Sequence, residues 1–373
     1  MPPTALVIGG TGPTGPSIIT GLEERGYRVS MLHTGKHELP ELPEQRLEHI
    51  HANPNFAESL TEGLAGRSYD LVVASYGRLR LLPEVLGGRT ERLISIGGTI
   101  YQYPMSRPAR EDAPRDVRHK LGARIVEAEA VLMQAHEAGL FNLTHLRYPN
   151  FYGPRQLAPR EWSVIRRLTD GRRRLPVLDG GRTLESRTYV ENAAHAVLVS
   201  VDHPEAARGQ AYSVVDEDTP SDADRILAIA GALGIDDLEL VSFPAALGRP
   251  AWYWGIGRDL SWSAEGNGPP TTHFIVSSDK IREQLGYRDL VPFTDAIERT
   301  VEWYRQHPLQ PGGEEEQQLS DPFDYDAEDA FLAAYDSFAE RCGAIQLADI
   351  QFKHQYDHPP AQQAEANQTT ASQ

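Results

Sequence analysis

Cysteine is almost absent from this sequence: Cys342 is the only one in 373 residues. A disulfide within the chain and a metal site built on several thiolates are therefore excluded. The sequence also lacks any apolar run near the roughly 18–20 residues that a membrane-spanning helix requires. Its first residues, Met-Pro-Pro-Thr, show no pattern of a signal or transit peptide. These absences predict a cytoplasmic protein without a membrane partner.

An excess of basic residues is missing as well. The chain has 36 Lys and Arg against 53 Asp and Glu, a net charge of -17. Proteins that bind nucleic acid backbones present a basic footprint instead, and the one dense basic run, Arg172 to Arg174, is typical of a solvated turn. We therefore expect a small-molecule substrate and no nucleic acid.

Metal ligands are not visible as a motif. The thirteen histidines are scattered, and their close pairs include His49 with His51 and His354 with His358. Neither pair belongs to a set with the spacing of a zinc site. The sequence therefore predicts no metal site.

What the first 150 residues do contain is an alternation of short apolar runs and amphipathic segments. Strands are predicted at residues 4–8, 27–32, 69–74, 92–96 and 142–147, with helices at 16–26, 57–65 and 120–137. Such an alternation predicts an α/β fold with a doubly wound parallel sheet.

The amino-acid composition changes after residue 150, which suggests a second lobe and a C-terminal extension. We expect residues 1–150 and about 187–215 to form a dinucleotide-binding domain, and residues 151–186 and 216–310 a smaller α+β substrate lobe. Residues 311–358 are expected to be a C-terminal extension with one helix near 326–341, and residues 359–373 a disordered tail rich in Gln, Ala and Thr.

A glycine-rich turn follows the first strand. Gly9 permits the tight turn, Gly12 lets the backbone approach a pyrophosphate, and Gly15 lets the helix pack on the strand. The phosphates would lie at the positive N-terminus of that helix, and a second strand follows at the expected distance. The run therefore predicts a dinucleotide site made by Gly9, Thr11, Gly12, Pro13, Thr14 and Gly15.

The end of the second predicted strand bears on the choice of cofactor. An acid there would hold the ribose hydroxyls of NAD, but this sequence has His33, Thr34 and Lys36, with no acid before Glu38. A hydroxyl, a lysine and histidines suit a 2′-phosphate, so NADP is favoured and NAD stays possible. The alternative is a solvated loop whose lysine contacts nothing.

Three motifs in order carry a family resemblance: the spaced glycines, the run Leu-Arg-Tyr-Pro-Asn-Phe-Tyr-Gly-Pro at 146–154, and Arg-Thr-Tyr-Val-Glu-Asn-Ala-Ala at 187–194. Over residues 4–305 the chain resembles the extended short-chain dehydrogenase/reductases of the NAD-dependent epimerase/dehydratase type. The resemblance implies a Rossmann-type domain that holds the cofactor, a smaller lobe that closes over the substrate, and a homodimer.

The resemblance also assigns further positions. Asn53 stands where the family has an aspartate that contacts adenine, and Ala74, Ser75 and Tyr76 fill the loop beside the adenosine ribose and phosphates. Asn150 resembles the asparagine at the substrate mouth. Arg187 resembles the arginine that meets a substrate phosphate, although it can instead pair with an acid between the lobes.

The catalytic positions depart from the family, which uses Ser or Thr and then Tyr-x-x-x-Lys. Gly97 stands at the hydroxyl position, and Lys120 and Arg124 stand near the tyrosine and lysine positions; no tyrosine occurs between 104 and 147. The remaining candidates for acid–base work are Lys120, Arg124 and Tyr101, with Tyr103 nearby. The alternatives are two exposed cations on a surface helix and tyrosines that only pack.

Three functions stay open at this point. The first is an atypical NAD(P)-dependent enzyme with redox, epimerase-like or dehydratase-like chemistry. The second is a non-catalytic NAD(P)-binding regulatory protein, and the third an RNA-associated relative, against which the charge of -17 argues. Trp252, Tyr253, Trp254 and Trp262 suggest either core packing or the wall of an apolar substrate pocket.

Overall fold

The computed structural model describes residues 1–36, 39–75, 77–102, 107–244, 273–319, 321–349 and 355–356. Tyr76, Tyr103, the aromatic segment at 252–262 and the tail at 359–373, all singled out above, lie outside the described residues. The chain divides into residues 1–332 and residues 333–373. The helix expected near 326–341 is present as α12 (Tyr325–Gly343).

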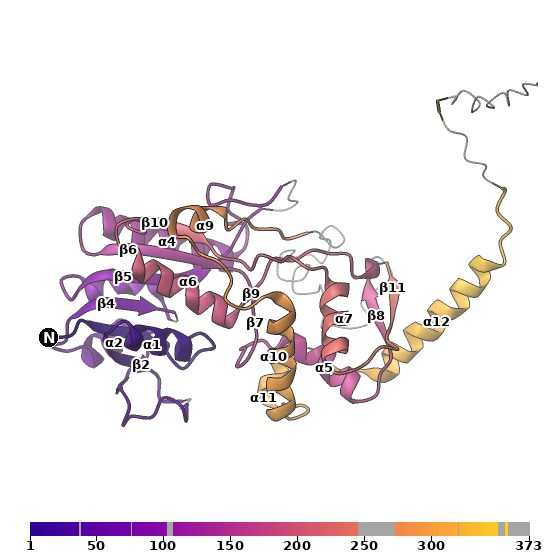
Figure 1. Cartoon of the computed structure of the whole chain (residues 1–373), viewed down its shortest axis with the longest axis horizontal. Coiled ribbons are helices and arrows are strands. Elements are labelled where there is room, and N and C mark those ends of the chain that lie inside the picture. The colour runs from indigo at the N-terminus through magenta and orange to yellow at the C-terminus, as the bar shows by residue number, and fades with distance from the viewer. Residues whose placement is uncertain are drawn as a thin grey trace, which may run out of the picture. The chain divides into compact units, whose positions relative to one another are not determined.

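A seven-stranded sheet organises the first unit (Figure 1). Every neighbouring pair in this sheet is parallel, and the spatial order is β10-β6-β5-β4-β1-β2-β3. The strands are β1 (Thr4–Ile8), β2 (Arg28–His33), β3 (Glu48–His51), β4 (Tyr69–Ala74), β5 (Thr90–Gly98), β6 (Asn142–Tyr148) and β10 (Gln210–Ser213). The predicted doubly wound, Rossmann-type sheet is therefore confirmed, with its change of direction between β1 and β4.

Helices cover both faces of this sheet, which explains why successive residues of a central strand such as β1 are buried on opposite faces. In β1, Ala5 and Val7 belong to one hydrophobic cluster, and Leu6 and Ile8 belong to another. The first cluster includes α1 (Gly15–Glu24), α6 (Val190–Asp202) and α9 (Asp279–Leu285), and the second includes α2 (Ala57–Gly63), α3 (Leu82–Leu86) and α4 (Lys120–Glu137). Each fully buried aliphatic side chain stabilises the folded state by about 1.5–3 kcal/mol relative to the same side chain left exposed.

A third hydrophobic cluster lies outside the large sheet. It is built from α5 (Arg160–Thr169), α7 (Asp222–Ala232), α10 (Phe293–Gln306) and the parallel pair β8 (Arg174–Leu178) and β11 (Glu239–Phe243). The remaining short elements are β7 (Phe151–Tyr152), β9 (Thr188–Tyr189), η1 (Leu79–Leu81), η2 (Asp179–Gly181) and α11 (Glu314–Gln317). The assignment of this region to a substrate lobe stays a prediction.

The Gly- and Glu-rich stretch after α10 packs against α5. Glu316 is buried and accepts hydrogen bonds from Trp162 Nε1 at 2.9 Å and Arg166 Nη1 at 2.7 Å. Arg167, which is fully buried, pairs with Asp321 at 2.7 Å. Ion pairs therefore anchor the residues before α12 to α5. Among the described residues, no helix is both long enough and apolar enough to cross a membrane.

Candidate functional site

The turn between β1 and α1 requires glycine for steric reasons. Gly9 has a φ of 87°, and its N–H donates to Leu32 O on β2 at 2.9 Å. A Cβ on Gly15 would lie 1.8 Å from Gly10 O, which is impossible without rebuilding the turn. A Cβ on Gly12 would lie 3.3 Å from Gly9 O. The glycine spacing thus produces the tight strand-to-helix turn that the sequence predicted.

The N-terminus of α1 directly follows this turn, at the carboxyl end of β1. Thr14 is the residue that precedes the helix, and its side chain makes no capping hydrogen bond. Pro16 lies in the first turn, which contains no acidic residue. Backbone N–H groups at a helix N-terminus attract an anion, so this end of α1 suits a pyrophosphate.

The turn lies where the sheet order changes direction. Ser75, directly after β4, donates from its N–H and from its hydroxyl to Ile8 O, each at 3.0 Å, and Ala74 is the register partner of Ile8. In open α/β sheets, ligands bind outside the carboxyl ends of the strands at such a point. The structure therefore brings the predicted residues Gly9, Ala74 and Ser75 together.

The predicted ribose and adenine residues gather at the ends of β2 and β3. Ala52 N donates to His33 O at 2.9 Å, which places Asn53 beside the loop after β2. Asn53 Oδ1 accepts hydrogen bonds from Asn55 N at 3.0 Å and Asn55 Nδ2 at 3.1 Å, so this oxygen is engaged within its own loop. Thr34 and Lys36 are exposed, whereas His33 is buried.

The predicted catalytic cations begin α4 and are both exposed. The buried face of α4 carries Gly122 and Glu129, and at 3.6 residues per turn Lys120 and Arg124 lie about 160° around the helix from Gly122. Ile125 is the residue that reaches the sheet, because its Cδ1 would lie 3.1 Å from a Cβ on Gly98 at the end of β5. The structure places Lys120 and Arg124 on the solvent side of α4.

Tyr101 lies in a buried polar network. Its hydroxyl is 2.7 Å from Ser213 Oγ and accepts a hydrogen bond from Arg147 Nη1 at 3.2 Å. Arg147 also donates from Nε to Glu129 Oε2 at 3.1 Å. Because Tyr101 is only 2% exposed, proton donation from its hydroxyl to a substrate would require this network to open.

A histidine that the sequence analysis did not single out occupies the space beside Gly97. A Cβ on Gly97 would lie 2.6 Å from His145 Nε2, and His145 Nδ1 is 2.8 Å from Ser95 Oγ. Burial, only partly offset by Glu129, lowers the pKa of His145 to about 4, so the imidazole is neutral near pH 7. The signal available in the sequence was a histidine inside the apolar strand at 142–147.

The two predicted substrate residues share a carboxylate. Arg187 donates from Nη1 to Glu161 Oε1 at 2.7 Å and from Nε to Glu185 Oε2 at 2.8 Å, and Asn150 Nδ2 donates to Glu185 Oε1 at 3.3 Å. Burial alone would lower the pKa of Arg187, but the two buried carboxylates raise it above its ordinary value. The alternative of an acid partner for Arg187 is thus the arrangement found.

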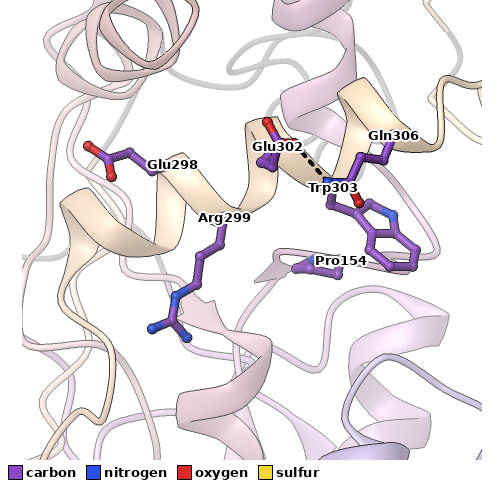
Figure 2. A pocket seen from close by; sticks show the side chains of 6 residues that line it. All are labelled: Pro154, Glu298, Arg299, Glu302, Trp303 and Gln306. Carbon is purple, nitrogen blue, oxygen red and sulfur yellow. Dashed lines mark hydrogen bonds between the residues drawn. The ribbon is translucent and has the colours of Figure 1, made fainter. Parts of the chain in front are cut away.

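Two surface hollows contain none of the predicted site residues. One, of about 390 Å³, is lined by five residues of α10 and by Pro154. Figure 2 shows the hydrogen bond that Gln306 Nε2 donates to Glu302 Oε1 at this hollow. The other, of about 850 Å³, lies among Thr4, Arg28 and Tyr69 at the amino ends of the strands. Neither lies at the carboxyl edge of the sheet.

Comparison with known proteins agrees with this geometry. Residues 76–214 match the sequence model of the NAD dependent epimerase/dehydratase family. A UDP-glucose 4-epimerase of Mycolicibacterium smegmatis is 27% identical over 242 residues, which cover 64% of this chain and 70% of that protein. A 3-diazoavenalumate denitrifying reductase of a Streptomyces species is 25% identical over 317 residues, covering 77% of this chain and 96% of that protein. The match to an uncharacterized protein of Sinorhizobium fredii, y4nL, spans only 56% of that relative.

Solved structures share the fold. The dTDP-glucose 4,6-dehydratase of Bacillus anthracis, solved with NAD, superposes with a TM-score of 0.63 at 14% identity over 81% of this chain and 96% of that chain. The UDP-glucose 4-epimerase of Thermotoga maritima, solved with UDP-glucose, gives a TM-score of 0.64 at 18% identity over 82% of this chain and 99% of that chain. The family resemblance seen in the sequence is confirmed, and the neighbours include NAD-bound enzymes.

Proposed function

From the premise that residues 76–214 match the sequence model of the NAD dependent epimerase/dehydratase family, we propose that the chain is an NADP-dependent reductase of a small molecule that works without Tyr-x-x-x-Lys. The observation that carries the proposal is the turn from Gly9 to Gly15. It lies at the switch point between β1 and β4, with the N-terminus of α1 directed to the same edge.

The choice of NADP rests on the loop after β2. Thr34 and Lys36 are exposed there, and between the end of β2 and Glu38 the sequence contains no acidic residue. A lysine adds a charge-assisted hydrogen bond to the 2′-phosphate of NADP, a group that NAD lacks. A carboxylate at the same place would instead favour the 2′-hydroxyl of NAD.

Reduction suits the groups present better than epimerisation or dehydration. Those reactions, when they begin with oxidation of an alcohol, need a base that removes the hydroxyl proton as the hydride leaves. Around the end of β5, Gly97 supplies no side chain for this task, and the nearby Tyr101 and His145 are buried and hydrogen-bonded to Ser213 and Ser95. In a reduction, the hydride passes from the nicotinamide to an electrophilic carbon, and the protein has only to deliver one proton to the neighbouring heteroatom.

Lys120 stays our candidate for that proton, because an ammonium group is a general acid. Since Lys120 lies on the solvent side of the first turn of α4, this assignment requires the substrate to bind over that side of the helix. Arg124, one turn later on the same side of the helix, is assigned to holding the cofactor. The 25% identical reductase that is matched over 96% of its length supports the reductive direction.

The substrate proposal follows from Arg187. A nucleotide-sugar diphosphate would have to compete with two buried carboxylates for this guanidinium, and breaking such a buried pair costs about 3–5 kcal/mol. We therefore propose a substrate without a diphosphate. A cytoplasmic location and a homodimer remain proposals from the sequence.

Fluorescence titration with NADPH and NADH tests the cofactor. Lys36→Ala should weaken NADPH binding by about 10-fold or more, because hydrogen bonds to charged groups contribute about 1.5–3 kcal/mol, and should leave NADH binding unchanged. Arg305→Ala, which removes an exposed cation from α10, is the matched control. Equal affinity for both cofactors, unchanged in Lys36→Ala, would contradict the NADP assignment.

Turnover separates the enzyme from a non-catalytic sensor, which the missing tyrosine also allows. With NADPH deuterated at the nicotinamide C4 and a panel of uncharged aromatic and carbonyl electrophiles, we expect deuterium in a reduced product. Tight NADPH binding with no deuterium transfer to any panel member would favour the regulatory protein.

A further inference from the structure

Three histidines meet at the carboxyl edge of the sheet. His33 ends β2, and its register partner on β3 is His51. His49 lies two residues before His51, so both project from the same face of β3. One ring nitrogen from each of the three lies within 4.8 Å of the other two, and His33 Nε2 is 3.1 Å from His49 Nδ1.

The rings are arranged around a common point. The His33 ring centroid lies 4.9 Å from that of His49 and 4.8 Å from that of His51, with the planes nearly perpendicular in both pairs. Imidazole nitrogens bind Zn²⁺ at about 2.0–2.1 Å in a tetrahedron, which puts two ligand nitrogens about 3.3 Å apart. The pair His33 Nε2 and His49 Nδ1 already has nearly this separation, and the third nitrogen lies within 4.8 Å of both.

The cluster combines a rigid base with an open side. His33 is 3% exposed, His49 is half-buried and His51 is exposed. Two hydrogen-bonded strands hold all three, and sites on strands are more precise than sites on loops. An ion can therefore reach the cluster from solvent on the side of His51.

We propose that His33, His49 and His51 bind a divalent transition-metal ion, with Zn²⁺ as the best match. Neutral imidazoles suit Zn²⁺, Ni²⁺ and Cu²⁺, whereas Mg²⁺ and Ca²⁺ prefer oxygen ligands. Three protein ligands and one open position are the composition of zinc sites that exchange their fourth ligand.

Metal binding acts on the neighbouring loop. Gly35 N–H donates to His33 Nδ1 at 3.3 Å. Coordination through His33 Nε2 places the ring proton on Nδ1, so this hydrogen bond must open. Gly35 lies between Thr34 and Lys36, which under the proposed function contact the 2′-phosphate. Metal binding therefore changes the affinity for NADPH, a consequence that rests on the proposed function, whereas the metal site does not.

Calorimetric titration of the untagged, chelator-treated full chain with Zn²⁺ tests the site, and Co²⁺ gives visible bands when it is bound with four ligands. We expect one equivalent per chain in the wild type. His49→Gln and His51→Gln each weaken Zn²⁺ binding by at least about 100-fold, because even outer-shell changes cost about 10- to 100-fold. His203→Gln, at an exposed histidine whose ring contacts Val199 O, is the matched control.

The outcomes are distinct. Absence of stoichiometric Zn²⁺ in the wild type, or equal affinity in His51→Gln with circular dichroism unchanged, overturns the site and leaves three imidazoles that only pack together. A second titration, of NADPH with and without Zn²⁺, should show different affinities in the wild type and equal ones in His51→Gln. If Zn²⁺ binds but NADPH does not bind under either condition, the proposed function fails and the metal site stands.

Discussion

Restoring a hydroxyl at the family's serine position should destabilise this protein. In Gly97→Ser, the new Cβ would lie 2.6 Å from His145 Nε2 and 2.7 Å from His145 Cε1. His145 is buried and is tied to Ser95 Oγ at 2.8 Å. The imidazole must therefore move, and movement breaks this hydrogen bond.

The size of the effect follows from two contributions. Overpacking a buried site costs about 1–3 kcal/mol, and the lost hydrogen bond adds about 0.5–1.5 kcal/mol. We expect a total of about 2–4 kcal/mol, which lowers Tm by roughly 3–6 °C at an unfolding entropy of about 2.1 cal/mol/K per residue. Differential scanning fluorimetry measures this shift.

A double-mutant cycle tests the cause. In a His145→Ala background the clash is absent, so Gly97→Ser should cost at least about 1 kcal/mol less than in the wild type. Gly231→Ser is the matched control, because a Cβ on this helical glycine meets nothing within 4 Å. Additive effects of Gly97→Ser and His145→Ala, or a Gly97→Ser protein as stable as the wild type, would show that a clash with His145 is not the cause.

Three further changes separate structural from catalytic roles. Arg187→Met leaves two buried carboxylates without their partner and should lower the free energy of unfolding in urea by about 3–5 kcal/mol. Arg299→Met, at an exposed ion pair, should lower it by less than about 1 kcal/mol. Similar losses in the two variants would show that burial of the Arg187 pairs does not matter. Burial, with a contribution from Asp289, raises the pKa of Asp216 from its ordinary 3.8 to about 7, so the folded state keeps a proton that the unfolded state loses. The stability of the wild type relative to that of the Asp216→Asn variant should therefore fall as pH rises from about 4 to about 7. A difference in Tm between the two proteins that stays constant over this range would count against the prediction. Lys120→Ala should lower kcat by about 100-fold or more without weakening NADPH binding, and unchanged turnover in a deuteride-transfer assay would remove Lys120 from the mechanism.

The sheet was predictable from the sequence because its strands are buried on both faces. Residues 4–8 and 69–74 are apolar except for Thr4 and Asp70, and β1 (Thr4–Ile8) and β4 (Tyr69–Ala74) have the predicted bounds. The turn at Gly9 was predictable for a related reason, since only glycine fits a φ of 87° there without strain. Local sequence sets both features.

The contacts across strands could not be predicted in this way. His33 is 16 residues from His49, so no local spacing shows that the register of β2 and β3 brings them together. The partners of Arg187 likewise depend on how α5 packs, because Glu161 lies 26 residues away. The position of α4 on the sheet decides that Ile125, rather than Arg124, reaches β5, and a count back from Arg147 does not fix that rotation.

Every function proposed for this chain depends on dinucleotide binding, which calorimetric titration of the wild type with NADPH measures. Gly12→Asp places a carboxylate against the pyrophosphate position, while Gly231→Ala changes a helical glycine with open space around it. We predict saturable binding of one NADPH per chain in the wild type and in Gly231→Ala, and its loss in Gly12→Asp. Failure of the wild type to bind NADPH or NADH below about 1 mM, near -4 kcal/mol, would contradict the account.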